Sequence, residues 1–211
     1  MRYVPLAAAA ALLSLSSVAR AENPWESLMG RKPRVWTDPA GRFSLDLPVG
    51  WTAQTHGDTG PVELWRSHQD SGQKAHVTVE LRNLPPGVKL SHFGVRVSEE
   101  VKKAAKNVQV VEEDRAEIGG YPAIRRLFTH QEAGNAALTD EVVQVIVVAG
   151  ERGVVITLET ALGARGLFWE EFELMMKGFV FGGSDLPLPK TGEGRRRVRA
   201  GEMVNPDAVP Y

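Results

Sequence analysis

The sequence predicts an α+β sandwich in which short antiparallel strands form a sheet with a helix on each face. Apolar and polar residues alternate in several short segments, which is the period of a half-buried strand. Two longer segments instead carry apolar residues at helical spacing. The order along the chain is strands, helix, strands, helix, and this order is typical of an α+β fold.

The first expected strand covers residues 43–47, where three apolar residues alternate with two polar ones. Pro48 ends this strand because proline has no N–H to donate to a neighbour, and Gly50 allows a tight turn. After this turn, the large ring of Trp51 is expected to face the covered side of the strand. We expect this unit to form the first edge of the domain, with Trp51 as a core residue.

Two further strands are predicted over 62–66 and 75–81, joined by a hairpin turn over 70–74. The first helix follows, with Ser91 as its expected N-cap and apolar residues at helical spacing as far as Val108. Charged residues occupy its other side. This helix should therefore rest on the sheet and keep one solvated face.

Four more strands and a second helix complete the predicted domain. The strand over 141–149 is nearly apolar on both faces, so we expect it to be central and covered on both sides. Gly178 is the expected C-terminal stop of the second helix. The other strands are expected over 108–118, 121–131 and 154–158, and the second helix over 164–177.

Residues 1–21 have the order of a secretory signal peptide: a basic start, an apolar stretch and the small-residue cleavage site Ala19-Arg20-Ala21. The apolar stretch is shorter than the roughly 20 residues that a membrane-spanning helix needs. We expect cleavage after Ala21 and export to the periplasm, or secretion if the source has a single membrane. The alternatives are a buried N-terminal helix and a retained membrane anchor.

The rest of the chain divides into a lead-in segment over 22–37, a folded domain over 38–183 and a tail over 184–211. The tail is rich in Pro, Gly and Arg without apolar periodicity, so we expect it to be disordered. The chain has no cysteine, so we expect it to have no disulfide and no lipoprotein anchor. Its 25 basic and 26 acidic residues argue against a nucleic-acid partner.

Candidate contact residues lie in the two flanking segments. The two tryptophans of the lead-in could contact a partner or fold against the edge of the domain. The arginine run of the tail could meet an anionic membrane surface or remain solvated. These candidate partner or membrane contacts are Trp25, Trp36, Arg195, Arg196, Arg197 and Arg199.

No catalytic residue, cofactor-binding residue or metal ligand is assigned from the sequence. The histidines are scattered without the His-x-x-x-His spacing of a helical metal site, and most such histidines are solvated or singly hydrogen-bonded. The possibility that folding brings some of these histidines together in space stays open. His76 and Glu80 are expected on the solvent-facing side of one strand; the other histidines are His56, His68, His92 and His130.

The motif Phe43-x-Leu45-x-Leu47-Pro48-x-Gly50-Trp51 resembles the start of PsbP-like and Mog1-like domains, including the bacterial DcrB-type (DUF1795-like) group. The strand opening Gly120-Tyr-Pro-Ala-Ile-Arg125 and the closing segment Gly178-Phe-Val-Phe181 are similar to theirs, and the resemblance covers about 38–181. It implies a three-layer α/β/α sandwich with a mostly antiparallel central sheet and two main helices. Members of these families are accessory subunits, transport cofactors and chaperone-like adaptors, mostly not enzymes.

The sequence therefore predicts an exported, non-catalytic accessory or scaffold module that binds protein partners in a bacterial cell-envelope complex. One alternative is a periplasmic domain that binds a small ligand or a metal ion. A less favoured alternative is an unrecognised hydrolase, which would need a pocket that gathers two or more histidines with a carboxylate.

Overall fold

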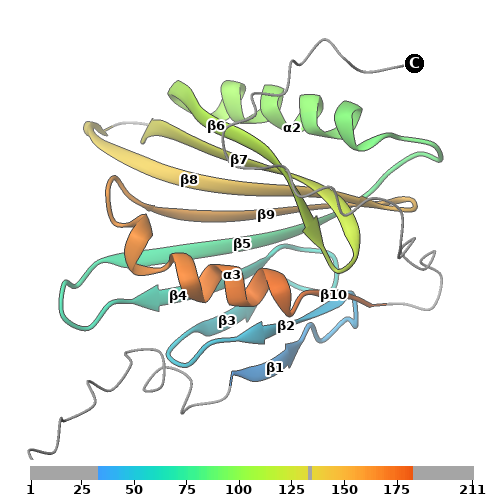
Figure 1. Cartoon of the computed structure of the whole chain (residues 1–211), viewed down its shortest axis with the longest axis horizontal. Coiled ribbons are helices and arrows are strands. Elements are labelled where there is room, and N and C mark those ends of the chain that lie inside the picture. The colour runs from blue at the N-terminus through green and yellow to red at the C-terminus, as the bar shows by residue number, and fades with distance from the viewer. Residues whose placement is uncertain (1–32, 133–134, 183–211) are drawn as a thin grey trace, which may run out of the picture. The chain divides into compact units, whose positions relative to one another are not determined.

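The structure is a computed structural model that describes residues 33–132 and 135–182, with the backbone alone at 132 and 135–138. A seven-stranded antiparallel sheet has the order β3-β4-β5-β9-β8-β7-β6, and a three-stranded sheet has the order β1-β2-β10 (Figure 1). The strands are β1 (Arg34–Thr37), β2 (Phe43–Leu47), β3 (Thr52–Thr55), β4 (Val62–Ser67), β5 (Lys74–Asn83), β6 (Lys106–Ile118), β7 (Tyr121–Glu132), β8 (Asn135–Ala149), β9 (Arg152–Ala161) and β10 (Val180–Phe181).

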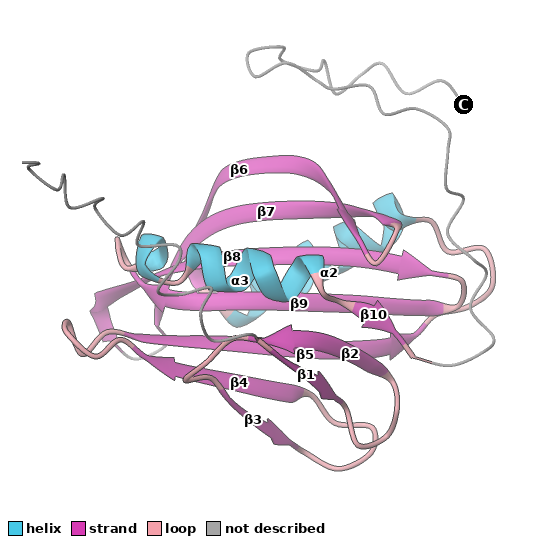
Figure 2. Ribbon diagram, turned by 60° about the horizontal axis from the view of Figure 1, so that its bottom comes forward, coloured by secondary structure: helices cyan, strands magenta, loops and turns pink. Residues whose placement is uncertain are grey.

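The two helices lie on opposite faces of the seven-stranded sheet (Figures 1 and 2). Helix α2 (Leu90–Ala104) covers one face. The short 3-10 helix η1 (Arg165–Leu167), helix α3 (Trp169–Lys177) and the three-stranded sheet cover the other. The predicted α+β sandwich with a mostly antiparallel central sheet and two main helices is confirmed.

The main core lies between the seven-stranded sheet and the layer that holds α3 and β2. The alternating residues predicted to point inward on β2 are buried, and Trp51 is 3% exposed. Its indole Nε1 donates a hydrogen bond of 2.7 Å to Glu171 Oε2 on α3, so the ring anchors the helix as well as filling space. Trp51 is thus a core residue, as the sequence predicts.

A smaller core lies between α2 and the opposite face of the sheet. Phe93 and Val97 of α2 pack on Ile146 and Val155. The buried guanidinium of Arg126 donates to the backbone carbonyl of Gly94 and also contacts the side chains of Ser98 and Glu113. Burying a charge is costly unless it is paired, so this set of contacts holds α2 over β6 and β7.

Several boundaries differ from the sequence prediction. Helix α2 begins at Leu90 and has no side-chain cap, so Ser91 is not its N-cap. The helix ends at Ala104 and β6 begins at Lys106, so Val108 lies in this strand and not in the helix. The predicted second helix is divided into η1 and α3. Strand β8 begins at Asn135, before its predicted start, because its first residues pair with β7.

The turn between β1 and β2 is built on Asp38, which is 2% exposed. Its carboxylate accepts hydrogen bonds of 2.6 and 3.0 Å from the Arg42 guanidinium, and these bonds lower its pKa. We expect Asp38→Asn to lower the free energy of unfolding at pH 7 by about 1.5–3 kcal/mol, because a charge-assisted pair is lost. The exposed Asp70 provides a matched control, Asp70→Asn, which should leave stability unchanged.

The same substitution has a defined pH dependence. A lowered pKa means that the folded state binds fewer protons than the unfolded state, so the contribution of Asp38 is present above about pH 4 and is lost as the pH falls further. Urea denaturation of the wild type and Asp38→Asn at pH 7 and pH 3 should show a gap in stability that narrows in acid. A gap that widens in acid would contradict this account.

Within residues 33–132 and 135–182, no helix has both the length and the apolar character needed to cross a membrane.

Candidate functional site

One face of the seven-stranded sheet is only partly covered. Helix α2 contacts mainly β6, β7 and β8, and among the described residues no helix contacts the same face of β3, β4 and β5 to a comparable extent. The strand register places two cross-strand rows of side chains on this surface. We call it the open sheet face, and its members are Thr52, Gln54, Glu63, Trp65, His76, Thr78, Thr157 and Glu159.

A stacked pair of rings lies at the centre of the open sheet face. Trp65 of β4 and His76 of β5 are directly opposite each other, and their ring centroids are 3.7 Å apart at an interplanar angle of 9°. Trp65 remains 42% exposed. The stack therefore holds a large aromatic side chain in one position while leaving much of it accessible.

Glu63 lies beside this stack and is flanked by two histidines. Its Oε2 is 3.3 Å from His56 Nε2 and 3.9 Å from His76 Nε2. Burial lowers the pKa of His76, while the charges of Glu63 and Glu159 act in the opposite direction. The His76 ring is therefore neutral at pH 7, and it stacks on Trp65 as an uncharged aromatic.

A second polar group lies at one end of this surface, where β7, β8 and β9 run side by side. His130, Asp140 and Glu159 each offer one nitrogen or oxygen atom, and these atoms lie within 4.8 Å of one another. His130 Nε2 is 3.5 Å from Glu159 Oε1. All three residues are half-buried, and their donor atoms are of the kinds that hold divalent metal ions in proteins.

Strand pairing explains why these three residues meet. His130 is directly opposite Asp140 in the β7–β8 ladder, and Asp140 is opposite Ala161 in the β8–β9 ladder. Glu159 lies two residues before Ala161, so it is the diagonal neighbour of Asp140 on the same face. Long side chains reach across such a diagonal. The histidines that the sequence shows as scattered are thus partly gathered by the fold: His56, His76 and His130 share one face.

A separate cleft of about 320 Å³ is lined by nine residues, among them Arg42, Arg82 and Arg152. Each guanidinium already has a partner. Arg42 pairs with Asp38, Arg82 contacts two glutamates, and Arg152 donates to the carbonyl of Gly182. No histidine lines this cleft. It does not provide the pocket of histidines and a carboxylate that the hydrolase alternative needs.

Of the contact residues predicted from the sequence, Trp36 lies on β1, where it is half-buried and its ring is 5.8 Å from that of Phe43. Trp36 therefore packs against the edge of the domain, which was the sequence-based alternative to contact with a partner. Trp25 and the arginines of the run Arg195–Arg199 lie outside the described residues.

Trp65 was not predicted as a contact residue, although its position in an alternating strand could have indicated its exposure.

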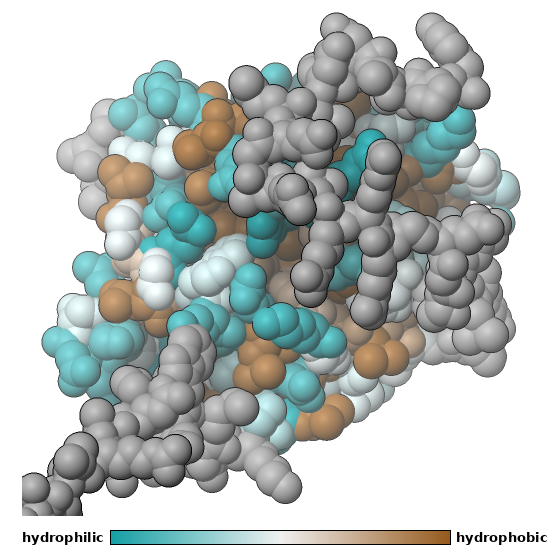
Figure 3. Space-filling model, viewed as in Figure 1, coloured by the Kyte–Doolittle hydropathy of each residue, from teal (hydrophilic) through white to brown (hydrophobic). Residues whose placement is uncertain are grey.

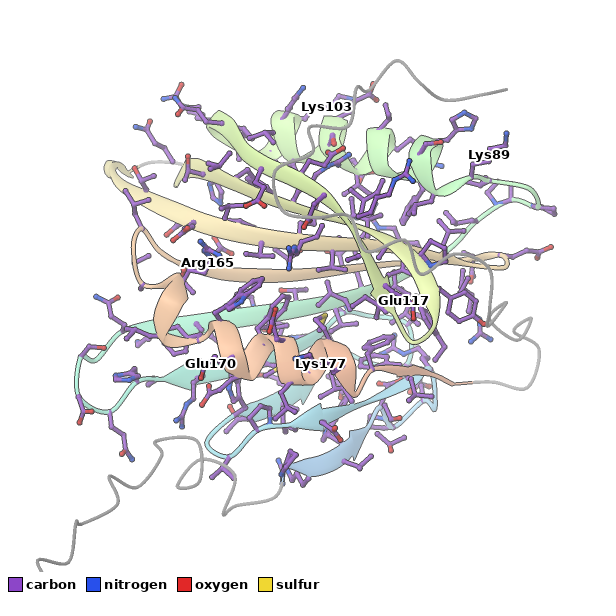
Figure 4. All side chains as sticks on the ribbon, in the orientation of Figure 1. Lys89, Lys103, Glu117, Arg165, Glu170 and Lys177 are labelled. Atoms are coloured by element: carbon purple, nitrogen blue, oxygen red, sulfur yellow. The ribbon has the colours of Figure 1, made fainter. Side chains whose placement is uncertain are left out.

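The opposite side of the domain carries α3 and provides control positions. Glu170 and Lys177 lie on the exposed side of this helix (Figure 4). Polar and apolar residues are interspersed over this face (Figure 3). Leu167 of η1 is 44% exposed, which closely matches the exposure of Trp65.

No protein-family profile and no curated protein matches the sequence. Solved structures do match the fold. Cyanobacterial PsbP (CyanoP) from Synechocystis sp. PCC 6803 is 12% identical, with a TM-score of 0.51 over 71% of this chain and 92% of that one. The Ran-binding protein Mog1p of Saccharomyces cerevisiae is 14% identical, with a TM-score of 0.53 over 71% and 95% of the two chains.

LpqN of Mycobacterium tuberculosis, which is involved in cell envelope biogenesis, is 12% identical, with a TM-score of 0.53 over 75% of this chain and 96% of that one. At such low identity the likeness shows the fold alone. The chain therefore has the fold of PsbP-like and Mog1-like proteins, and the predicted resemblance is confirmed at that level.

Proposed function

We propose that this chain is an exported, non-catalytic accessory module that binds a protein partner in the bacterial cell envelope. The observation that carries the proposal is the open sheet face with Trp65 at its centre. Tryptophan is enriched among the residues that contribute most to binding at protein interfaces. Because Trp65 is already held against His76 at 3.7 Å, little side-chain entropy remains to be lost when a partner covers it.

The charges around Trp65 favour a partner that presents a cationic side chain. Glu63 shares the β4–β5 ladder with the ring pair, and Glu159 is directly opposite His76. An arginine placed over the exposed part of the indole would gain a cation–π contact and could reach a carboxylate. We therefore infer that the partner surface offers arginine or lysine at the centre of the contact.

Two further observations support the proposal. Solved structures with this fold include a Ran-binding protein and a protein involved in cell envelope biogenesis. Residues 1–21 have the order of an export signal. We propose on this basis that the chain acts in the periplasm, or outside the cell if the source has a single membrane.

Co-purification from crosslinked, detergent-solubilised envelopes tests this function. We expect the wild type to recover a partner and Trp65→Ala to weaken its binding by about 30-fold, because a central aromatic contact is worth about 2 kcal/mol or more. Leu167→Ala, which removes a side chain of similar exposure on the other face, should bind as the wild type does. Recovery of the chain alone, or equal recovery with Trp65→Ala, would contradict the proposal.

A further inference from the structure

We propose that His130, Asp140 and Glu159 form a binding site for one divalent transition-metal ion of the zinc class. One nitrogen and two carboxylate oxygens from these residues lie within 4.8 Å of one another. They come from three adjacent, hydrogen-bonded strands, β7, β8 and β9. The inference does not depend on the proposed partner binding.

The spacing of the donor atoms fits a tetrahedral ion. Zinc binds imidazole nitrogen and carboxylate oxygen at about 2.0–2.2 Å, so two ligand atoms at a tetrahedral angle are about 3.4 Å apart. His130 Nε2 and Glu159 Oε1 are 3.5 Å apart. These two atoms therefore need almost no movement to share an ion, and an Asp140 carboxylate oxygen lies within 4.8 Å of both as the third ligand.

The second nitrogen of His130 supports the same assignment. His130 Nδ1 lies 3.3 Å from the backbone carbonyl oxygen of Gln131, which can only accept a hydrogen bond. A proton on Nδ1 is donated to this carbonyl, which leaves Nε2, 3.5 Å from Glu159 Oε1, as the nitrogen that can bind a metal ion. A metal-binding histidine commonly donates its other N–H to a backbone carbonyl in this way.

The donor set defines the class of ion. One imidazole nitrogen with two carboxylates suits zinc and its neighbours in the first transition row, whereas calcium and magnesium prefer oxygen ligands alone. Three protein ligands leave a fourth position for water or an incoming group. The side chain of Glu159 is 40% exposed, so an ion can enter from solvent.

Zinc titration of the full chain, purified without a histidine tag and stripped of metal, tests the site. We expect isothermal titration calorimetry to show one zinc ion per chain. Glu159→Gln and His130→Gln should each weaken binding by about tenfold or more, since even the residues behind metal ligands commonly change affinity by that factor. Cobalt bound at the same site should give a visible absorption band that zinc removes and calcium does not.

Two control variants separate this site from other histidines and acids. His56→Gln alters the pair with Glu63, and Glu170→Gln alters an exposed acid on α3; both should bind zinc as the wild type does. Circular dichroism identifies any variant that fails to fold. If His130→Gln does not fold, Glu159→Gln still tests the site, because the Glu159 side chain is 40% exposed. No zinc binding by the wild type, unchanged affinity in folded Glu159→Gln, or loss of binding in His56→Gln would overturn the assignment.

Discussion

Replacing Phe43 with alanine is expected to lower the free energy of unfolding by about 3–5 kcal/mol, the usual effect of removing a buried phenylalanine ring. Phe43 is 1% exposed and lies on β2. Its ring stacks on Phe179 with centroids 5.2 Å apart and an interplanar angle of 14°. Phe43 therefore packs β2 against the segment that follows α3, and its replacement by alanine leaves a cavity between them.

Urea denaturation followed by circular dichroism measures this effect. Phe43→Leu, which keeps most of the apolar volume, should cost less than the alanine substitution. Val35→Ala is the surface control because Val35 is 71% exposed on the neighbouring strand β1. If Phe43→Ala were as stable as Val35→Ala, the three-stranded sheet would not be part of the main core.

The second large effect is expected for Gly153→Ala, which should destabilise the domain by about 1–3 kcal/mol through overpacking. A Cβ atom at Gly153 would lie 2.6 Å from Cζ and 2.7 Å from Cε1 of Phe93, the ring that anchors α2 to the sheet. Those distances are far below van der Waals contact. Either the ring or the whole helix must move away.

A double-mutant cycle with Phe93→Leu separates this clash from other effects. Leucine lacks the ring atoms that would collide, so Gly153→Ala should cost less in the Phe93→Leu background than in the wild type. Gly166→Ala is the matched control because a Cβ there meets no atom within 4 Å. Equal costs in both backgrounds would show that Phe93 does not pack on Gly153.

The sequence was informative wherever one face of an element is buried. The alternation over 43–47 and the apolar stretch over 141–149 predicted β2 and the covered part of β8, because the burial of apolar side chains decides those segments. Residues 135–140 and Arg34–Thr37 are in strands without such a pattern. Backbone pairing with neighbouring strands places them, and no local pattern of residues records that pairing.

The candidate site could be predicted less well than the fold. His130 and Glu159 lie on β7 and β9, which are separated by β8, so their approach depends on two strand registers at once. The stacking of Trp65 on His76 similarly depends on the β4–β5 register. Sequence spacing carried no signal for either contact. The alternation did place His76 on the less covered side of its strand, as predicted.

The central claim is that the open sheet face binds a protein partner, and site-specific photo-crosslinking in intact cells tests it most directly. A photoreactive amino acid at position 65 should give a discrete crosslinked adduct, identifiable by mass spectrometry, because the Trp65 side chain is 42% exposed at the centre of that face. The same amino acid at position 167, on the α3 face, should not give that adduct. No adduct at position 65, or the same adduct at both positions, would contradict the claim.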